Sequence, residues 1–115
     1  MSTTLYHNPR CSTSRQALAL LREHGIEPIV VDYLKTPFTR DALTDLITRS
    51  KLSPRAFLRS KEALYQSLQL DDLTLSDDEM IEALLQHPVL FNRPVVANEK
   101  GVRIGRPVEN ILELL

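Results

Sequence analysis

The order in which hydrophobic patterns change along the 115 residues constrains the fold most strongly. Residues 3–6 are predicted to form a short strand, residues 13–24 a helix, and residues 28–33 a β-branched strand. Gly25 follows the helical pattern directly and is predicted to end it. Two strands joined by a helix form a parallel pair with a right-handed crossover. The N-terminal third therefore predicts a β-α-β unit.

The middle of the chain has only helical patterns. One helix is predicted after a Thr39 cap, a short one from Ser53-Pro54 to about Leu58, and another after the capping-box pattern Ser76–Glu79. The His87-Pro88 pair is predicted to end that last helix. Its predicted apolar face consists of Met80, Ile81, Leu84 and Leu85.

The C-terminal third returns to strands. Residues 94–97 and 102–104 are predicted to form a β-hairpin, and a last helix is predicted after Gly105-Arg106-Pro107. Its predicted inward positions are Val108, Ile111, Leu112 and Leu115. The complete order predicts an α/β protein with a thioredoxin-like fold, in which a helical insertion separates the β-α-β and β-β-α halves. We expect residues 1–115 to form a single domain.

Composition and charge exclude several classes of function. The formal charge is −1, which gives no general attraction to nucleic acid or to membrane surfaces. No apolar segment predicts a signal peptide or a membrane span. One cysteine cannot form an internal disulfide, so a reducing cytoplasm is expected. One cysteine and three scattered histidines lack metal-ligand spacing, so no metal site is predicted.

Cys11 is the strongest candidate for chemistry. It lies where the first strand turns into the first helix, and unpaired amides at a helix N-terminus favour a thiolate or a bound oxyanion. Arg10 and Arg15 flank it and are expected to lower its pKa further. The position three residues on is Ser14, so a second thiol has to come from another molecule. An inert, buried cysteine is the alternative interpretation.

Several other residues could assist this thiol. His7 lies four residues before Cys11 and either packs locally or helps to form the thiolate. Arg59, Arg93 and Arg106 lie at transitions between predicted elements. The predicted topology brings Arg93 towards Cys11, but it does not place Arg59 or Arg106. A tyrosine-phosphatase loop is not predicted, because residue 17, where its arginine would stand, is alanine.

The chain also resembles a known family. Residues 7–15 look like the signature of the glutathione- and glutaredoxin-coupled arsenate reductases. Further similar motifs lie at 33–37, 55–59, 86–96 and 105–107. The resemblance implies that Cys11 is the nucleophile, that His7 activates it, and that Arg59, Arg93 and Arg106 bind the oxyanion. It assigns secondary thiolate-stabilising roles to Ser14, Arg15 and Arg10. Likeness to thioredoxin-like folds also predicts a cis peptide before Pro94.

The implied activity is reduction of arsenate to arsenite by a cytoplasmic monomer. Glutathione would be a co-substrate, glutaredoxin a partner, and no cofactor would be tightly bound. One alternative is a glutathione-linked thiol reductase or deglutathionylase of the same fold with little arsenate activity. Another is an RNA-polymerase-binding regulator, although such relatives typically have Cys-x-x-Cys and lack the arginine set. A housekeeping paralogue with residual arsenate activity also remains open.

Overall fold

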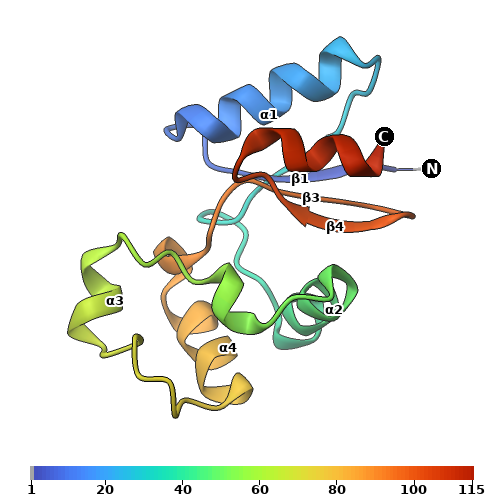
Figure 1. Cartoon of the computed structure of the whole chain (residues 1–115). Coiled ribbons are helices and arrows are strands. Elements are labelled where there is room, and N and C mark those ends of the chain that lie inside the picture. Colours follow the sequence, from blue (N-terminus) through green and yellow to red (C-terminus); the bar gives the residue numbers. More distant parts are fainter. Residues whose placement is uncertain (1) are drawn as a thin grey trace. The chain divides into compact units, whose positions relative to one another are not determined.

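The computed structural model describes residues 2–115, which divide into two compact units (Figure 1). One unit contains the chain up to Thr36 together with Arg93–Leu115, and the other contains Pro37–Asn92. The first has strands β1 (Thr4–His7), β2 (Ile29–Asp32), β3 (Val95–Asn98) and β4 (Gly101–Ile104), helix α1 (Ser12–Glu23) and the 3-10 helix η3 (Val108–Leu114). The second has helices α2 (Arg40–Ser50), α3 (Ala63–Ser67) and α4 (Asp77–Gln86) and the 3-10 helices η1 (Pro54–Phe57) and η2 (Pro88–Leu90).

The sheet of the first unit has the strand order β2-β1-β3-β4. β1 runs parallel to β2, with Leu5 opposite Val30, and antiparallel to β3, with Leu5 opposite Val96. β3 and β4 form an antiparallel hairpin in which Asn98 pairs with Gly101. The parallel β-α-β pair and the C-terminal hairpin are therefore confirmed, and the element order is that of the predicted thioredoxin-like fold.

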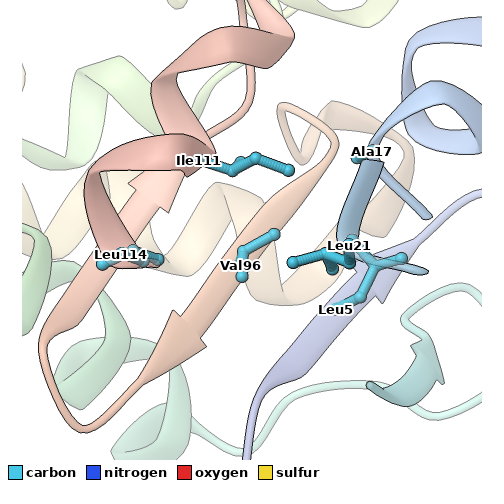
Figure 2. Packing of buried hydrophobic residues seen from close by; sticks show 6 residues of the cluster. All are labelled: Leu5, Ala17, Leu21, Val96, Ile111 and Leu114. Carbon is cyan, nitrogen blue, oxygen red and sulfur yellow. The ribbon is translucent and has the colours of Figure 1, made fainter. Parts of the chain in front are cut away.

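The core of this unit lies between the sheet and two helices. Helices α1 and η3 lie on the same side of the sheet (Figure 1). Six fully or almost fully buried side chains from β1, β3, α1 and η3 pack together (Figure 2): Leu5, Ala17, Leu21, Val96, Ile111 and Leu114. Their burial fixes the helices α1 and η3 relative to the sheet.

The predicted inward face of the last helix is partly wrong. Leu112 is 41% exposed, whereas Ile111 and Leu114 are buried. The segment forms a 3-10 helix instead of an α-helix. Side chains three residues apart share one face of a 3-10 helix, so Ile111 and Leu114 point inward together and Leu112 turns outward.

The second unit confirms the predicted caps. The Thr39 hydroxyl accepts a hydrogen bond from the Ala42 backbone N–H at 3.1 Å, and Ser76 forms a capping box with Glu79. The segment after Ser53-Pro54 is a 3-10 helix that ends at Phe57. The short helix α3 was not predicted, since five residues carry too little periodicity to be recognised. Within residues 2–115, no helix is long and apolar enough to cross a membrane.

Candidate active site

Cys11 is the N-cap residue of α1, as the sequence predicted for a thiol at a strand-to-helix turn. Its backbone N–H donates to the Asn8 carbonyl at 3.0 Å, and the Arg10 N–H donates to the Asn8 side-chain oxygen at 3.0 Å. Asn8 thus holds the turn that presents the thiol, and Cys11 remains partly exposed. Sequence reasoning gave Asn8 no role, although Asn-Pro is a known turn signal.

Ser14 ties the end of β1 to the first turn of α1. Its hydroxyl lies 2.6 Å from the His7 Nδ1 and accepts the Asn8 backbone N–H at 3.1 Å. All three residues are buried, and Ser14 is fully so. Burial lowers the pKa of His7 below its ordinary value, with Arg15 adding to this and Asp32 opposing it. At neutral pH His7 is therefore a neutral imidazole that anchors Ser14.

The surroundings of the Cys11 sulfur favour its ionised form. Burial raises the Cys11 pKa, but the Ser14 backbone N–H, the Arg93 side chain, the Arg106 charge and the Thr13 backbone N–H lower it by more. The Ser14 and Thr13 backbone N–H groups lie on the side of the sulfur and favour its negative charge, although the Cys11 side chain makes no capping hydrogen bond to the helix. The Arg106 Nη2 donates directly to Sγ at 3.2 Å. The net result is a pKa below the ordinary value of a thiol.

The arginines beside the thiol are not those next to it in sequence. Neither Arg10 nor Arg15 is among the groups that lower the Cys11 pKa. Arg10 is exposed, and the Arg15 Nη1 donates to the Pro9 carbonyl at 2.9 Å. Arg15 therefore fixes the loop before the thiol, while the charge at the sulfur comes from Arg93 and Arg106.

Arg93 and Arg106 come from adjoining parts of the sheet. Arg93 precedes β3 and Arg106 follows β4, and these strands pair with Val95 opposite Ile104. The Arg106 Nε donates to the Arg93 carbonyl at 2.6 Å. Both arginines precede a cis proline, which confirms the prediction for Arg93–Pro94 and adds a second, unpredicted cis bond at Arg106–Pro107.

Gly105 allows this close approach of the two segments. Its N–H donates to the Pro94 carbonyl at 2.8 Å. A Cβ atom at Gly105 would lie 2.9 Å from the Pro94 Cγ and 3.3 Å from the Ile111 Cγ2. Any larger residue would therefore separate the segment that carries Arg106 from the one that carries Arg93.

Arg59 belongs to the second unit. Its backbone N–H donates to the Leu90 carbonyl at 2.7 Å, next to the bridge between Leu58 and Phe91. Its Nε lies 3.4 Å from the Glu62 Oε1, and both side chains are half-buried. The chain segment that follows η1 is thus bonded to the segment that follows η2, and this fixes the position of Arg59 within its own unit.

The arrangement around Cys11 is suited to nucleophilic attack on an anion. A partly exposed thiolate at a helix N-terminus has two guanidinium groups beside it, and guanidinium forks match the oxygens of tetrahedral oxyanions. Among residues 2–115, no group of three or more His, Cys, Asp or Glu side chains is arranged to hold a metal ion.

Comparison with known proteins decides the family. The family model described as the ArsC family matches residues 6–114. This chain belongs to the ArsC family. An arsenate reductase of Escherichia coli K12 is 46% identical over 112 residues, which are 97% of this chain and 79% of that protein. The uncharacterized protein YfgD of the same strain is also 46% identical over 112 residues, 96% of this chain and 94% of that protein.

A solved structure supports the same assignment. The arsenate reductase from Vibrio cholerae has a TM-score of 0.95 and 46% sequence identity, and the match covers 100% of this chain and 98% of that one. The thioredoxin-like fold and the family resemblance predicted from the sequence are therefore confirmed.

Proposed function

We propose that this ArsC-family chain is an arsenate reductase with Cys11 as its nucleophile. The observation that carries the proposal is the contact of 3.2 Å between the Arg106 guanidinium and the Cys11 sulfur. A guanidinium group, which is suited to binding oxyanions, thus lies beside a thiol whose pKa is already lowered. Similar proteins named arsenate reductases support arsenate as the oxyanion.

The first step joins sulfur to arsenic. The side chains of Arg93 and Arg106 bind the arsenate oxygens, and the family resemblance implies the same role for Arg59. The Cys11 thiolate attacks arsenic, and an S–As bond forms as one As–OH bond breaks. The departing hydroxyl group takes up a proton from solvent and leaves as water. The arginine charges stabilise the crowded oxyanion during this attack.

The second step transfers two electrons to arsenic. A glutathione thiolate attacks the Cys11 sulfur and forms a disulfide, while the S–As bond breaks with its electron pair on arsenic. Arsenic(V) becomes arsenic(III) and leaves as arsenite. A glutaredoxin thiol then takes the glutathionyl group from Cys11 and restores the thiolate. Both thiols come from other molecules because the chain has one cysteine.

The residues around the thiol have supporting roles in this scheme. Ser14 and His7 hold the first turn of α1 so that its amides face the sulfur. Arg15 fixes the loop through Pro9, and the exposed Arg10 attracts anions entering from solvent. The protein works as a monomer in the reducing cytoplasm and needs no tightly bound cofactor, since glutathione supplies the electrons.

The test is arsenite release by the purified protein with glutathione and glutaredoxin, with each component omitted in turn. We expect release only with the complete mixture, and none from Cys11→Ser with an unchanged far-UV circular dichroism spectrum. Reduction of a glutathione mixed disulfide without any arsenite release would replace the proposal with the thiol-reductase alternative. Arsenite release by Cys11→Ser would exclude the mechanism itself.

A further inference from the structure

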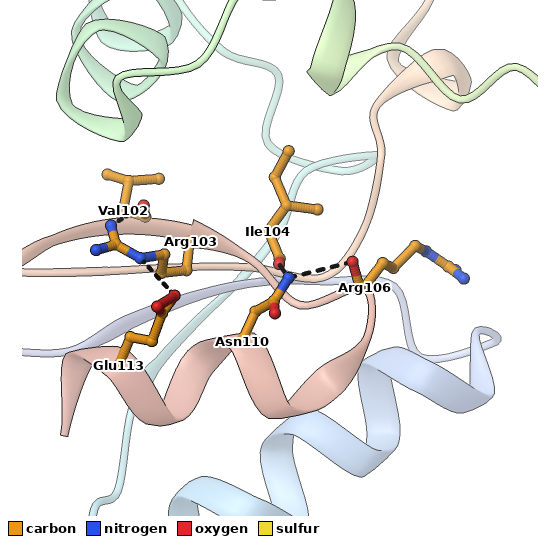
Figure 3. A network of polar contacts seen from close by, with 6 residues as sticks. All are labelled: Val102, Arg103, Ile104, Arg106, Asn110 and Glu113. Carbon is orange, nitrogen blue, oxygen red and sulfur yellow. Dashed lines mark hydrogen bonds and ion pairs between the residues drawn. The ribbon is translucent and has the colours of Figure 1, made fainter.

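A polar network anchors the turn that carries Arg106. The side-chain amide of Asn110, on η3, donates to the Ile104 carbonyl at 3.2 Å and to the Arg106 carbonyl at 3.2 Å (Figure 3). One half-buried side chain thus joins the end of β4, the residue before Pro107 and the first turns of η3. The Asn110 backbone N–H also donates to the Pro107 carbonyl at 3.0 Å.

The anchored segment is the one that points a charge at the thiol. The Arg106 side chain extends away from Asn110 (Figure 3), and its Nη2 reaches the Cys11 sulfur. Two other bonds constrain the same turn, from the Arg106 Nε to the Arg93 carbonyl and from the Gly105 N–H to the Pro94 carbonyl. Both hold the turn from the β3 side. The Asn110 side chain holds it from the η3 side, so replacing that side chain removes both bonds to the Ile104 and Arg106 carbonyls and leaves only the backbone bond to Pro107.

We propose that Asn110 is a positioning residue, which fixes the Arg106 backbone so that its guanidinium stays against the Cys11 sulfur. The inference rests on the proposed role of Cys11 as the reactive thiol. It adds to that proposal a residue that touches neither the thiol nor the oxyanion. Asparagine suits the role because its amide group supplies two N–H donors without charge, and both go to carbonyl groups of this turn.

The experiment measures the ionisation of Cys11 without arsenate. Iodoacetamide alkylation is followed against pH for the wild type, Asn110→Leu and Asn110→Ala. In both variants we expect the midpoint of the alkylation profile to lie roughly half to one pH unit above that of the wild type. This shift corresponds to the net contribution of one hydrogen bond. The midpoint is used because the rate constant of a thiolate itself rises with its pKa. Leucine is similar in size to asparagine and is a good helix former, so Asn110→Leu should leave no cavity and should not weaken η3. It therefore gives a second folded variant to test if Asn110→Ala unfolds.

A double-mutant cycle separates positioning from general destabilisation. In an Arg106→Ala background the Asn110 substitutions should leave the midpoint unchanged, since the group that they position is gone. Glu113→Gln is the matched control, because Glu113 lies on the same helix but pairs with Arg103 (Figure 3). Its midpoint should equal that of the wild type. Because no arsenate is present, the result does not depend on whether the chain reduces arsenate.

Two outcomes would overturn the proposal. The first is an alkylation midpoint in folded Asn110→Leu that equals the midpoint of the wild type. The other is an equal shift in the wild-type and Arg106→Ala backgrounds, which would show that Asn110 acts on the fold and not through Arg106.

Discussion

Replacing Arg106 by glutamine tests the centre of the site. The substitution removes the charged guanidinium group that donates a hydrogen bond to the Cys11 sulfur at 3.2 Å. A hydrogen bond to a charged group contributes about 1.5–3 kcal/mol, and one pKa unit corresponds to about 1.36 kcal/mol. Across 3.2 Å the Coulomb attraction at the dielectric of water is about 1.3 kcal/mol. Because Cys11 is partly exposed, we expect a loss at the lower end of this energy range, which corresponds to a rise of about one unit in the Cys11 pKa.

The loss in arsenate reduction should be larger than this shift explains. Removing one preorganised oxyanion donor costs about 2.7–4 kcal/mol, or roughly a hundred- to a thousandfold in rate. The pKa shift accounts for about tenfold at most. We therefore expect Arg106→Gln to lower kcat/KM for arsenate by at least about a hundredfold. Arg106→Lys should also be impaired, because lysine keeps the charge but not the fork.

Two assays separate the effects on the thiol and on the oxyanion. Arsenite release with glutathione and glutaredoxin gives kcat/KM, and the pH profile of alkylation gives the Cys11 midpoint. Arg103→Gln is the matched control, since Arg103 lies on β4 and pairs with Glu113 at 3.1 Å. Its values should stay near those of the wild type. A kcat/KM within threefold of the wild type in Arg106→Gln, or an equal midpoint shift in Arg103→Gln, would refute the reasoning.

Three further predictions concern Arg59, His7 and Gly105. Arg59→Gln should lower arsenate kcat/KM by about a hundredfold or more but shift the Cys11 alkylation midpoint less than Arg106→Gln does. Arsenate kinetics equal to those of the wild type would show that Arg59 does not bind the oxyanion. Burial lowers the folded-state pKa of His7, so the unfolded chain binds its proton more readily. The unfolding free energy from urea titrations should therefore fall as pH drops below about 6.5 towards the folded-state pKa of His7. In His7→Asn, the contribution of His7 to this pH dependence of the unfolding free energy should be absent. Gly105→Ala should destabilise the protein by about 1–3 kcal/mol, because its Cβ would meet Pro94 at 2.9 Å. A urea midpoint equal to that of the wild type would contradict the overlap.

The order of elements was predictable because its signals are local. Hydrophobic period distinguishes strand from helix over a few residues, and Thr39 and Ser76 mark helix starts through bonds made within one turn. For the same reason the sequence placed Cys11 at a strand-to-helix turn. The inward face of the last helix was predicted less well, because Ile111 and Leu114 follow a 3-10 period that the sequence does not distinguish from an α-helical one.

Only the tertiary structure decided which charges reach the thiol. Arg10 and Arg15 are close to Cys11 in sequence, yet Arg10 is exposed and Arg15 donates to the Pro9 carbonyl, whereas Arg106 is 95 residues away and donates to the sulfur. That contact requires the β3–β4 register, the close packing at Gly105 and the turn held by Asn110. Such interactions join segments that no local pattern relates. The sequence alone therefore determined the fold class and identified Cys11 as the candidate nucleophile, and packing determined the electrostatic environment of its thiol.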